Sequence, residues 1–284
     1  MKIARRAALL GVLVGAWLVG SAPLVARQES AAVASQTLTH AQMEEFLLHA
    51  RVGKTENASK GVTGTRRATL SDGRITHDAS IQSIDVSKTR FEPDRGPVEL
   101  NFRDSYRYNI AGYRLARLLE LDNVPVSVER RVAGSVASVT WWIDDVIMDE
   151  NDRVKRRPVG QLSSRAAGQI HMMRVFDELI ANTDRNGGNM MWTGDGNLWM
   201  IDHSRAFRLD KRLRRPQLLE RCDRAMFQKM RELTTEAVRQ AAGDSLNRGE
   251  VEALLARRDE VVKLFEGMMA QRSEAAVFFT LPSR

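Results

Sequence analysis

The chain has 284 residues, of which 43% are hydrophobic and 28% are charged, so it can form one large globular domain or two lobes. The formal net charge is +7 and falls to +4 without residues 1–26, which argues against the concentrated basic face of a nucleic-acid-binding protein. The single cysteine, Cys222, excludes an intramolecular disulfide, and no Cys/His spacing typical of a structural zinc site occurs.

Residues 1–26 have the pattern of an export signal. Three basic residues precede an uncharged run, 7–26, that is rich in Leu, Val, Ala and Gly. We expect cleavage after Ala26, with residues 27–37 as a linker. An uncleaved anchor is the alternative, since the run is nearly long enough to span a bilayer, and it is the only membrane association we expect. The sequence therefore predicts an exported protein of a periplasm, a secretory lumen or the medium.

The first predicted element after the linker is a helix from about residue 40 to 50. Thr39 and Gln42 match a capping box at its start. A small antiparallel unit follows in residues 58–85, where apolar and polar residues alternate around a turn at residues 71–73.

A glycine-bearing loop opens this unit and contains Lys60, Gly61 and Gly64. Glycine lets backbone N–H groups approach a ligand closely, so such a loop can cover phosphate groups. A plain surface hairpin is the alternative.

The middle of the chain predicts a helix over 104–121, with Asp104 as its N-cap. A strand follows at 126–130 and a β-rich run at 136–148. Trp141 and Trp142 in this run are expected in the core, with the wall of a cofactor pocket as the alternative. The polar segment 149–158 reads as the boundary between two lobes.

The second half is predicted to be mainly helical, with a helix starting at Ser163 or Ser164 and further helices to about residue 269. A β-hairpin interrupts it within residues 176–207. Two short apolar strands flank the polar turn 193–197, which places Trp192 opposite Leu198.

The same pairing brings polar side chains together at the open end of the hairpin. Asn189 falls opposite Ile201 and therefore beside Asp202, while Asp184 lies in the glycine-broken loop just before. Oxygen ligands next to a further carboxylate are what Mg²⁺-dependent phosphoryl transfer requires.

The ordered pattern Asn-x-Asp-Arg-x-x-x-Asn, a hairpin and then Ile-Asp resembles the catalytic core of atypical kinases, in particular the phosphoinositide 3-/4-kinase-like and the secretory-pathway (Golgi casein kinase-like) kinases. The resemblance implies that Asp184 orients or deprotonates the acceptor hydroxyl, with Arg185 beside it among the catalytic residues. It implies that Asn189 and Asp202 hold the metal ion. Asn186 stands where these families often carry His. The alternative is a polar turn before a hairpin in any α+β protein.

The chain departs from these kinases at an ion pair. In them a strand Lys that holds the α- and β-phosphates pairs with a Glu of the following helix. Gln82 and Asn109 stand at these two positions, so the charges are absent but the two amides can hydrogen-bond to each other. With Lys60, Gly61 and Gly64 they are the residues expected at the nucleotide. Lys60 or Lys88 can supply charge from elsewhere.

These observations predict an α+β, bilobal protein-kinase-like fold with a mainly β small lobe, 38–148, and a helical large lobe, 149–284. The predicted function is Mg²⁺- and ATP-dependent phosphoryl transfer to a hydroxyl acceptor on a protein, a sugar or a lipid headgroup, without a nucleic-acid partner. One alternative is an exported pseudokinase that binds a partner or nucleotide without turnover, since the ion pair is missing. The other is a structural export domain with a coincidental polar loop.

Overall fold

The computed structural model describes residues 38–57, 65–92, 98–156 and 162–281. By its contacts the chain divides into two units, Met1–Thr37 and Leu38–Arg284, and all the described residues belong to the second. The predicted signal and linker, and the loop residues Lys60, Gly61 and Gly64, lie outside the described residues. Over the described ranges, no helix is both long enough and apolar enough to cross a membrane.

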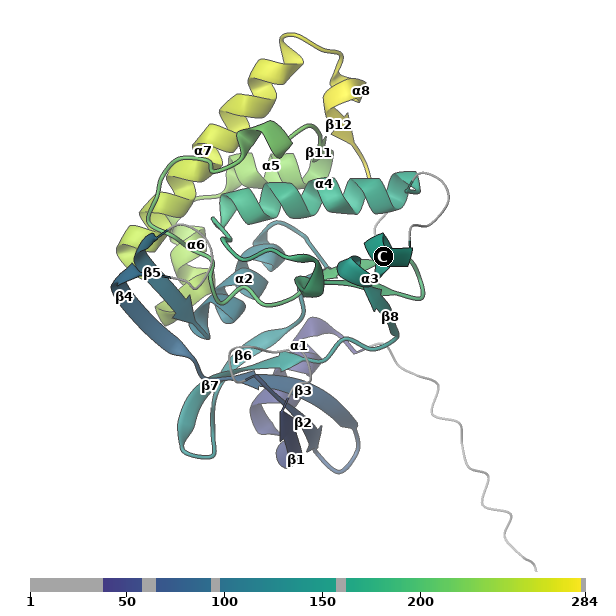
Figure 1. Cartoon of the computed structure of the whole chain (residues 1–284), viewed down its shortest axis with the longest axis vertical. Helices are drawn as coiled ribbons and strands as arrows, with labels where there is room; N and C mark the ends of the chain where they lie inside the picture. The colour runs from purple at the N-terminus through teal and green to yellow at the C-terminus, as the bar shows by residue number, and fades with distance from the viewer. Residues whose placement is uncertain (1–37, 58–64, 93–97, 157–161, 282–284) are drawn as a thin grey trace, which may run out of the picture. The chain divides into compact units, whose positions relative to one another are not determined.

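The first half of the unit is built on an antiparallel sheet that has five strands in the described residues, in the order β1-β2-β3-β7-β6 (Figure 1). Helices α1 and α2 pack against β6 and β7. The predicted capping box starts α1: Gln42 N–H donates to Thr39 Oγ1, and Thr39 N–H donates to Gln42 Oε1. The bounds are α1 (His40–His49), β1 (Arg51–Asn57), β2 (Arg66–Ser71), β3 (Thr76–Gln82), α2 (Arg107–Leu118), β6 (Ser127–Val132) and β7 (Ser135–Trp141).

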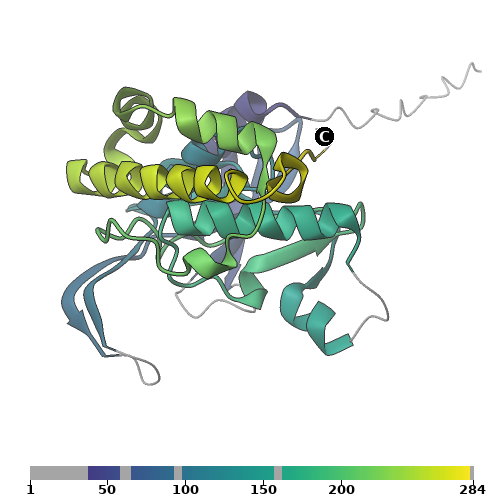
Figure 2. The same cartoon turned by 90° about the horizontal axis from the view of Figure 1, so that it is seen from above.

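A separate hairpin, β4 (Asp85–Phe91) and β5 (Glu99–Ser105), lies between β3 and α2 in the chain and stands at one edge of the molecule (Figure 2). The sequence analysis did not predict it. It also corrects the expected N-cap: Asp104 lies in β5, because its Cα pairs with that of Val86 and the backbone is still extended there. Helix α2 starts only at Arg107.

The second half is mainly helical, and α4 and α7 lie side by side in it (Figure 2). The predicted cap Ser163 accepts a hydrogen bond from Ala166 N–H at the start of α4. The helices are α3 (Glu150–Arg156), α4 (Ser164–Leu179), α5 (Arg224–Glu232), α6 (Thr235–Ala242), α7 (Arg248–Met269) and α8 (Glu274–Val277), with short 3₁₀ turns η1 (Gly187–Asn189), η2 (Pro216–Leu218) and η3 (Gly243–Ser245). Two short strands, β11 (Cys222–Asp223) and β12 (Phe278–Phe279), pair in parallel.

The segment predicted as the boundary between the lobes, 149–158, contains α3 in its described part, 149–156. Asp149 accepts a hydrogen bond from Asp152 N–H at 2.8 Å, which satisfies a free donor at the start of that helix. The β-rich run before it is divided between two sheets, because β7 belongs to the large sheet and β8 (Val146–Asp149) pairs with β9.

The predicted hairpin is present with the predicted register. Strands β9 (Met190–Thr193) and β10 (Leu198–Met200) are antiparallel, and Trp192 lies opposite Leu198. Gln169 of α4 fixes the second strand, since its Oε1 accepts from Leu198 N–H at 2.8 Å. The β-rich first half and the helical second half confirm the predicted α+β fold class. The lobe bounds 38–148 and 149–284 stay a prediction.

A buried arginine joins α7 to the rest of the helical half. Arg257 is fully buried, and its guanidinium donates to the backbone carbonyls of Leu179 (2.9 Å), Arg208 (2.8 Å) and Asp210 (2.5 Å). Burial lowers the pKa of Arg257 to about 10, so the side chain is still charged at neutral pH. It therefore ties the end of α4 and the segment after the hairpin to α7.

We predict that Arg257→Ala lowers the free energy of unfolding by about 2–4 kcal/mol, because it leaves buried carbonyl groups without a donor. Urea denaturation followed by circular dichroism measures this loss. The control Arg239→Ala, on the exposed side of α6, should change stability by less than about 0.5 kcal/mol. A loss below about 1 kcal/mol in the Arg257 variant would mean that other contacts hold these segments together.

Candidate active site

Arg185 organises the loop that precedes the hairpin. Its side chain is 5% exposed and forms a bidentate ion pair with Asp177 of α4, with Nε at 2.9 Å from Oδ2 and Nη2 at 3.0 Å from Oδ1. Its Nη1 donates to the carbonyl oxygens of Asn189 (2.9 Å) and Ile201 (2.8 Å), which lie at the open end of the hairpin. Arg185, expected among the catalytic residues, is therefore directed into the protein, where it positions the loop.

Asp184, the predicted catalytic acid, projects from this loop. Its backbone N–H donates to Asn182 Oδ1 at 3.0 Å, while Asn182 Nδ2 donates to Asp177 Oδ1 at 3.0 Å, so the loop is anchored to α4 twice. The Asp184 side chain is 41% exposed and its Oδ1 lies 3.5 Å from Nη1 of Arg205. A ligand can therefore reach this carboxylate.

The two predicted metal ligands flank the open end of the hairpin: Asn189 directly precedes β9, and Asp202 follows the end of β10. Ile201 N–H donates to Asn189 O at 3.1 Å, so Asn189 lies opposite Ile201, the residue before Asp202, in the predicted register. Asn189 Nδ2 donates to the backbone carbonyl of Asp184 at 3.3 Å, which leaves the amide Oδ1 as a possible ligand atom. Asp202 has a φ of +53°, a left-handed conformation that Asp tolerates better than most residues.

Asp104 is a residue of this region that the sequence analysis missed as a site residue. Ser105 N–H donates to Ser204 O at 2.8 Å, which joins the end of β5 to the segment after Asp202. Asp104 is only 5% exposed, and its Oδ1 has no hydrogen-bond partner among the described residues. The signal in the sequence is weak: Phe102 and Asp104 alternate with exposed residues on one buried face of β5.

The carboxylates of this region repel one another. Burial raises the pKa of Asp104, and the charges of Asp202 and Asp184 raise it further, against a hydrogen bond from Ser204 and the charge of Arg205. Burial also raises the pKa of Asp184, with Asp202 adding to the effect and Arg205 opposing it.

Two arginines that are held by the β4–β5 hairpin carry the positive charge that opposes these carboxylates. Glu99 of β5 pairs with Arg205 at 2.5 Å and with Arg208 at 2.7 Å. Both guanidinium groups lie over the ring of Phe102, at 5.0 and 5.2 Å from its centroid. Arg205 is thereby held between Glu99 and Asp184.

Gln82 and Asn109 form the neutral hydrogen bond that the sequence allowed. Asn109 Nδ2 donates to Gln82 Oε1 at 2.5 Å, and Asn109 Oδ1 accepts from His203 N–H at 2.8 Å. The amide pair therefore links β3, α2 and the segment after Asp202 without adding charge. Lys88 lies instead over the Phe91 ring at 5.1 Å and lines a small pocket of about 130 Å³ that contains none of the predicted site residues.

His203 packs the segment after Asp202 against the protein interior. Arg185 Nη2 lies 3.0 Å from His203 Nε2 and can only donate, so Nε2 accepts and the imidazole carries its proton on Nδ1. Burial and the Arg185 charge hold the pKa of His203 well below its usual value. Helix α2 passes closely above the ring: a Cβ added to Gly112 would lie 3.2 Å from His203 Cγ.

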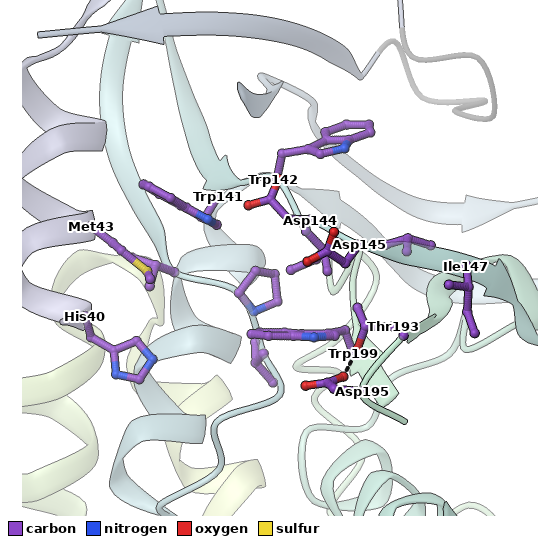
Figure 3. A pocket seen from close by; sticks show the side chains of 16 residues that line it. His40, Met43, Trp141, Trp142, Asp144, Asp145, Ile147, Thr193, Asp195 and Trp199 are labelled. Carbon is purple, nitrogen blue, oxygen red and sulfur yellow. Dashed lines mark hydrogen bonds between the residues drawn. The ribbon is translucent and has the colours of Figure 1, made fainter. Parts of the chain in front are cut away.

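Two pockets of the described structure, each larger than 600 Å³, do not contain the predicted acid or metal ligands. One, of about 640 Å³, lies beside the connector between β7 and β8, where Trp141, Trp199 and the α1 residues His40 and Met43 gather around it (Figure 3). Trp141 is thus half-buried and lines this pocket. Its ring stacks on the imidazole of His77, with 3.7 Å between the two ring centroids. The other, of about 700 Å³, reaches the loop from the α3 side. Over the described part of the chain, no three carboxylate, imidazole or thiol side chains already form a metal-binding group.

We predict that Gly112→Ala destabilises the protein by about 1–2 kcal/mol. An alanine in a helix interior is normally about 1 kcal/mol better than glycine, but here its methyl group would press on His203, which Arg185 holds in place. The matched control Gly267→Ala, in α7 with open space around the added methyl, should be neutral or stabilising. Thermal and urea unfolding of both variants measure the difference, and equal gains in stability would show that His203 can move aside.

No protein-family model matches this chain, and no curated protein sequence matches it. Its fold matches solved structures. A hydra Fam20 structure with sugar superposes with a TM-score of 0.64 over 84% of this chain and 92% of that chain, at 12% sequence identity. A Golgi casein kinase with Mn/ADP bound superposes with a TM-score of 0.61 over 86% of this chain and 80% of that chain, at 13% identity. The chain therefore has an atypical protein-kinase-like fold.

Proposed function

We propose that the protein is an exported atypical kinase that transfers the γ-phosphoryl group of ATP to a hydroxyl acceptor with the help of a divalent cation such as Mg²⁺. The observation that carries this proposal is the register of the hairpin, which sets Asn189 beside Asp202 and next to the loop of Asp184. The kinase-like fold, and the Mn/ADP in the Golgi casein kinase structure, support it.

The donor set suits a hard divalent cation. The Oδ1 of Asn189 and the carboxylate of Asp202 are both oxygen ligands, and Mg²⁺ is usually held by one or two such protein groups together with phosphate oxygens and water. When bound, the cation would neutralise phosphate oxygens. Gln82 and Asn109, with Lys60, Gly61 and Gly64, are proposed to line the nucleotide.

Asp184 would accept the proton of the acceptor hydroxyl. As that O–H bond breaks, the acceptor oxygen forms a bond to the γ-phosphorus, and the bond from phosphorus to the β,γ-bridging oxygen breaks, leaving its electron pair on ADP. Burial raises the pKa of Asp184 and makes it a better base, while Arg205 at 3.5 Å favours its charged form. The acceptor can be a protein, a sugar or a lipid headgroup.

A pseudokinase that binds nucleotide without turnover is the second candidate, favoured by the neutral Gln82–Asn109 pair. An amide offers no net charge to the α- and β-phosphates, so nucleotide affinity or rate would be lower than with a lysine unless another group compensates.

We predict that Mg²⁺ with ATP raises the unfolding midpoint of the purified chain, since a ligand at 100 times its Kd contributes about 2.7 kcal/mol. Asp202→Asn should abolish this shift, because the amide removes a charged metal ligand while Asn tolerates the same backbone conformation. Differential scanning fluorimetry measures both. Asp223→Asn, a buried aspartate on β11 that bonds to Met226 N–H, is the matched control and should keep the shift.

Asp184→Asn should keep the ATP-dependent shift but reduce ADP formation at least about 10²-fold, because it removes the base and leaves the ligands in place. A coupled ADP assay with mixed sugar and protein acceptors measures this. A shift without any ADP formation in the parent chain would favour the pseudokinase, and no shift in the parent chain would refute the proposed site.

A further inference from the structure

The pocket beside the connector between β7 and β8 has aromatic walls. Trp141 and Trp199 line it, and its volume of about 640 Å³ lies within the range of about 300–1,000 Å³ that is usual for ligand sites. The Trp141 ring is held in place, because it stacks on His77 and lies edge-to-face with Phe46 at 5.6 Å between centroids. The pocket therefore offers a rigid aromatic surface to a ligand.

Carboxylates surround this aromatic surface. Asp144 and Asp145 of the connector and Asp195 of the β9–β10 turn line the pocket, and the described residues that line it include neither lysine nor arginine. In Figure 3 the ring of Trp199 lies between Asp195 and the two connector aspartates. The chain as a whole carries a net charge of +7, so the pocket is opposite to it in sign. Such a pocket attracts a cation and repels an anion.

One of the three carboxylates is available to a ligand without the loss of an existing contact. Asp144 Oδ2 lies 2.8 Å from His77 Nε2, and Asp195 Oδ1 accepts from Thr193 Oγ1 at 2.6 Å. The side chain of Asp145 is exposed and has neither a hydrogen bond nor an ion pair with any residue that the structure describes. Asp145 is therefore the carboxylate best placed to bind a cation.

The tryptophan next to Trp141 shows which cation suits such a surface. The guanidinium of Arg67 lies over the ring of Trp142, 4.4 Å from its centroid, and its Nε donates to Asp78 Oδ2 at 2.7 Å. One planar group thus stacks on an indole and bonds to a carboxylate at the same time, which a guanidinium does better than the compact ammonium of lysine. The pocket offers the same pair of partners, an indole and a carboxylate.

We propose that this pocket binds an arginine side chain of a polypeptide partner. The guanidinium would stack on the ring of Trp199 and form an ion pair with Asp145. The pocket is larger than a single side chain needs, and its lining includes the apolar residues Met43, Val126 and Ile147. These side chains suit apolar residues on either side of the arginine.

The pocket is separate from the proposed active site, because Asp184, Asn189 and Asp202 do not line it. Its carboxylates would repel the phosphate groups of a nucleotide. It is lined by α1 from the first half of the fold and by the β9–β10 turn from the second, so a partner bound here would contact both halves. The inference does not depend on the proposed phosphoryl transfer.

The test is isothermal calorimetry of the full chain with a short peptide, blocked at both ends, that has arginine between two leucines. The same peptide with citrulline should bind at least about tenfold more weakly, because citrulline keeps the shape of arginine but has no charge. Free arginine should also bind more weakly than the arginine peptide, because it lacks the apolar neighbours.

Variants of the pocket assign the binding to its residues. Asp145→Asn should weaken binding of the arginine peptide at least about threefold and make it less sensitive to NaCl, because an exposed ion pair is screened by salt. Trp199→Leu should weaken binding at least about tenfold, while Trp199→Phe should lose less because it keeps an aromatic face. The control Asp259→Asn, an exposed aspartate of α7 outside the pocket, should bind as the parent chain does.

Equal binding of the arginine and citrulline peptides, or no binding of either, would overturn the inference. Unchanged binding by Asp145→Asn would overturn the assigned ion pair, and because this side chain is exposed, the variant tests it even if Trp199→Leu fails to fold. Equal affinity for free arginine would overturn the polypeptide as the source of the guanidinium. The proposed kinase function would stand in each of these cases.

Discussion

The buried ion pair between Asp177 and Arg185 is the interaction on which the candidate site depends. One guanidinium bonds to α4, to both backbone carbonyls at the end of the hairpin and to His203. Breaking a buried pair by removing one partner costs about 3–5 kcal/mol, because the remaining charge has neither water nor a counter-ion. The loop, the hairpin end and the segment after Asp202 therefore keep their relative positions through a residue that is itself too buried to meet a substrate.

Around this anchor the described part of the site contains three carboxylates, and its arginines are already engaged in ion pairs. Asp104, Asp184 and Asp202 act on one another, and Arg205 opposes them while also pairing with Glu99. The strand and helix positions that carry a Lys–Glu pair in the kinases this chain resembles hold a hydrogen-bonded amide pair.

The β4–β5 hairpin connects the two halves of the fold at this point. Through Glu99 it binds Arg205 and Arg208, through Phe102 it supports both guanidinium groups, and through Ser105 it bonds to the backbone of Ser204. An element between β3 and α2 thus sets the surroundings of the segment that follows Asp202. The position of Arg205, which Glu99 of this hairpin holds, therefore influences the pKa of Asp184.

The sequence by itself determined the local features: the capping box of α1, the start of α4 and the hairpin register that sets Asn189 beside Asp202. These depend on turn residues and on the two-residue alternation of strands, which act over a few positions. Only the tertiary structure decided that Asp104 is buried in a strand whose end bonds to the segment after Asp202, and that Arg185 turns inward. Both depend on contacts between distant segments, such as Ser105 with Ser204, and pairing across such separations leaves no periodic signal in the sequence.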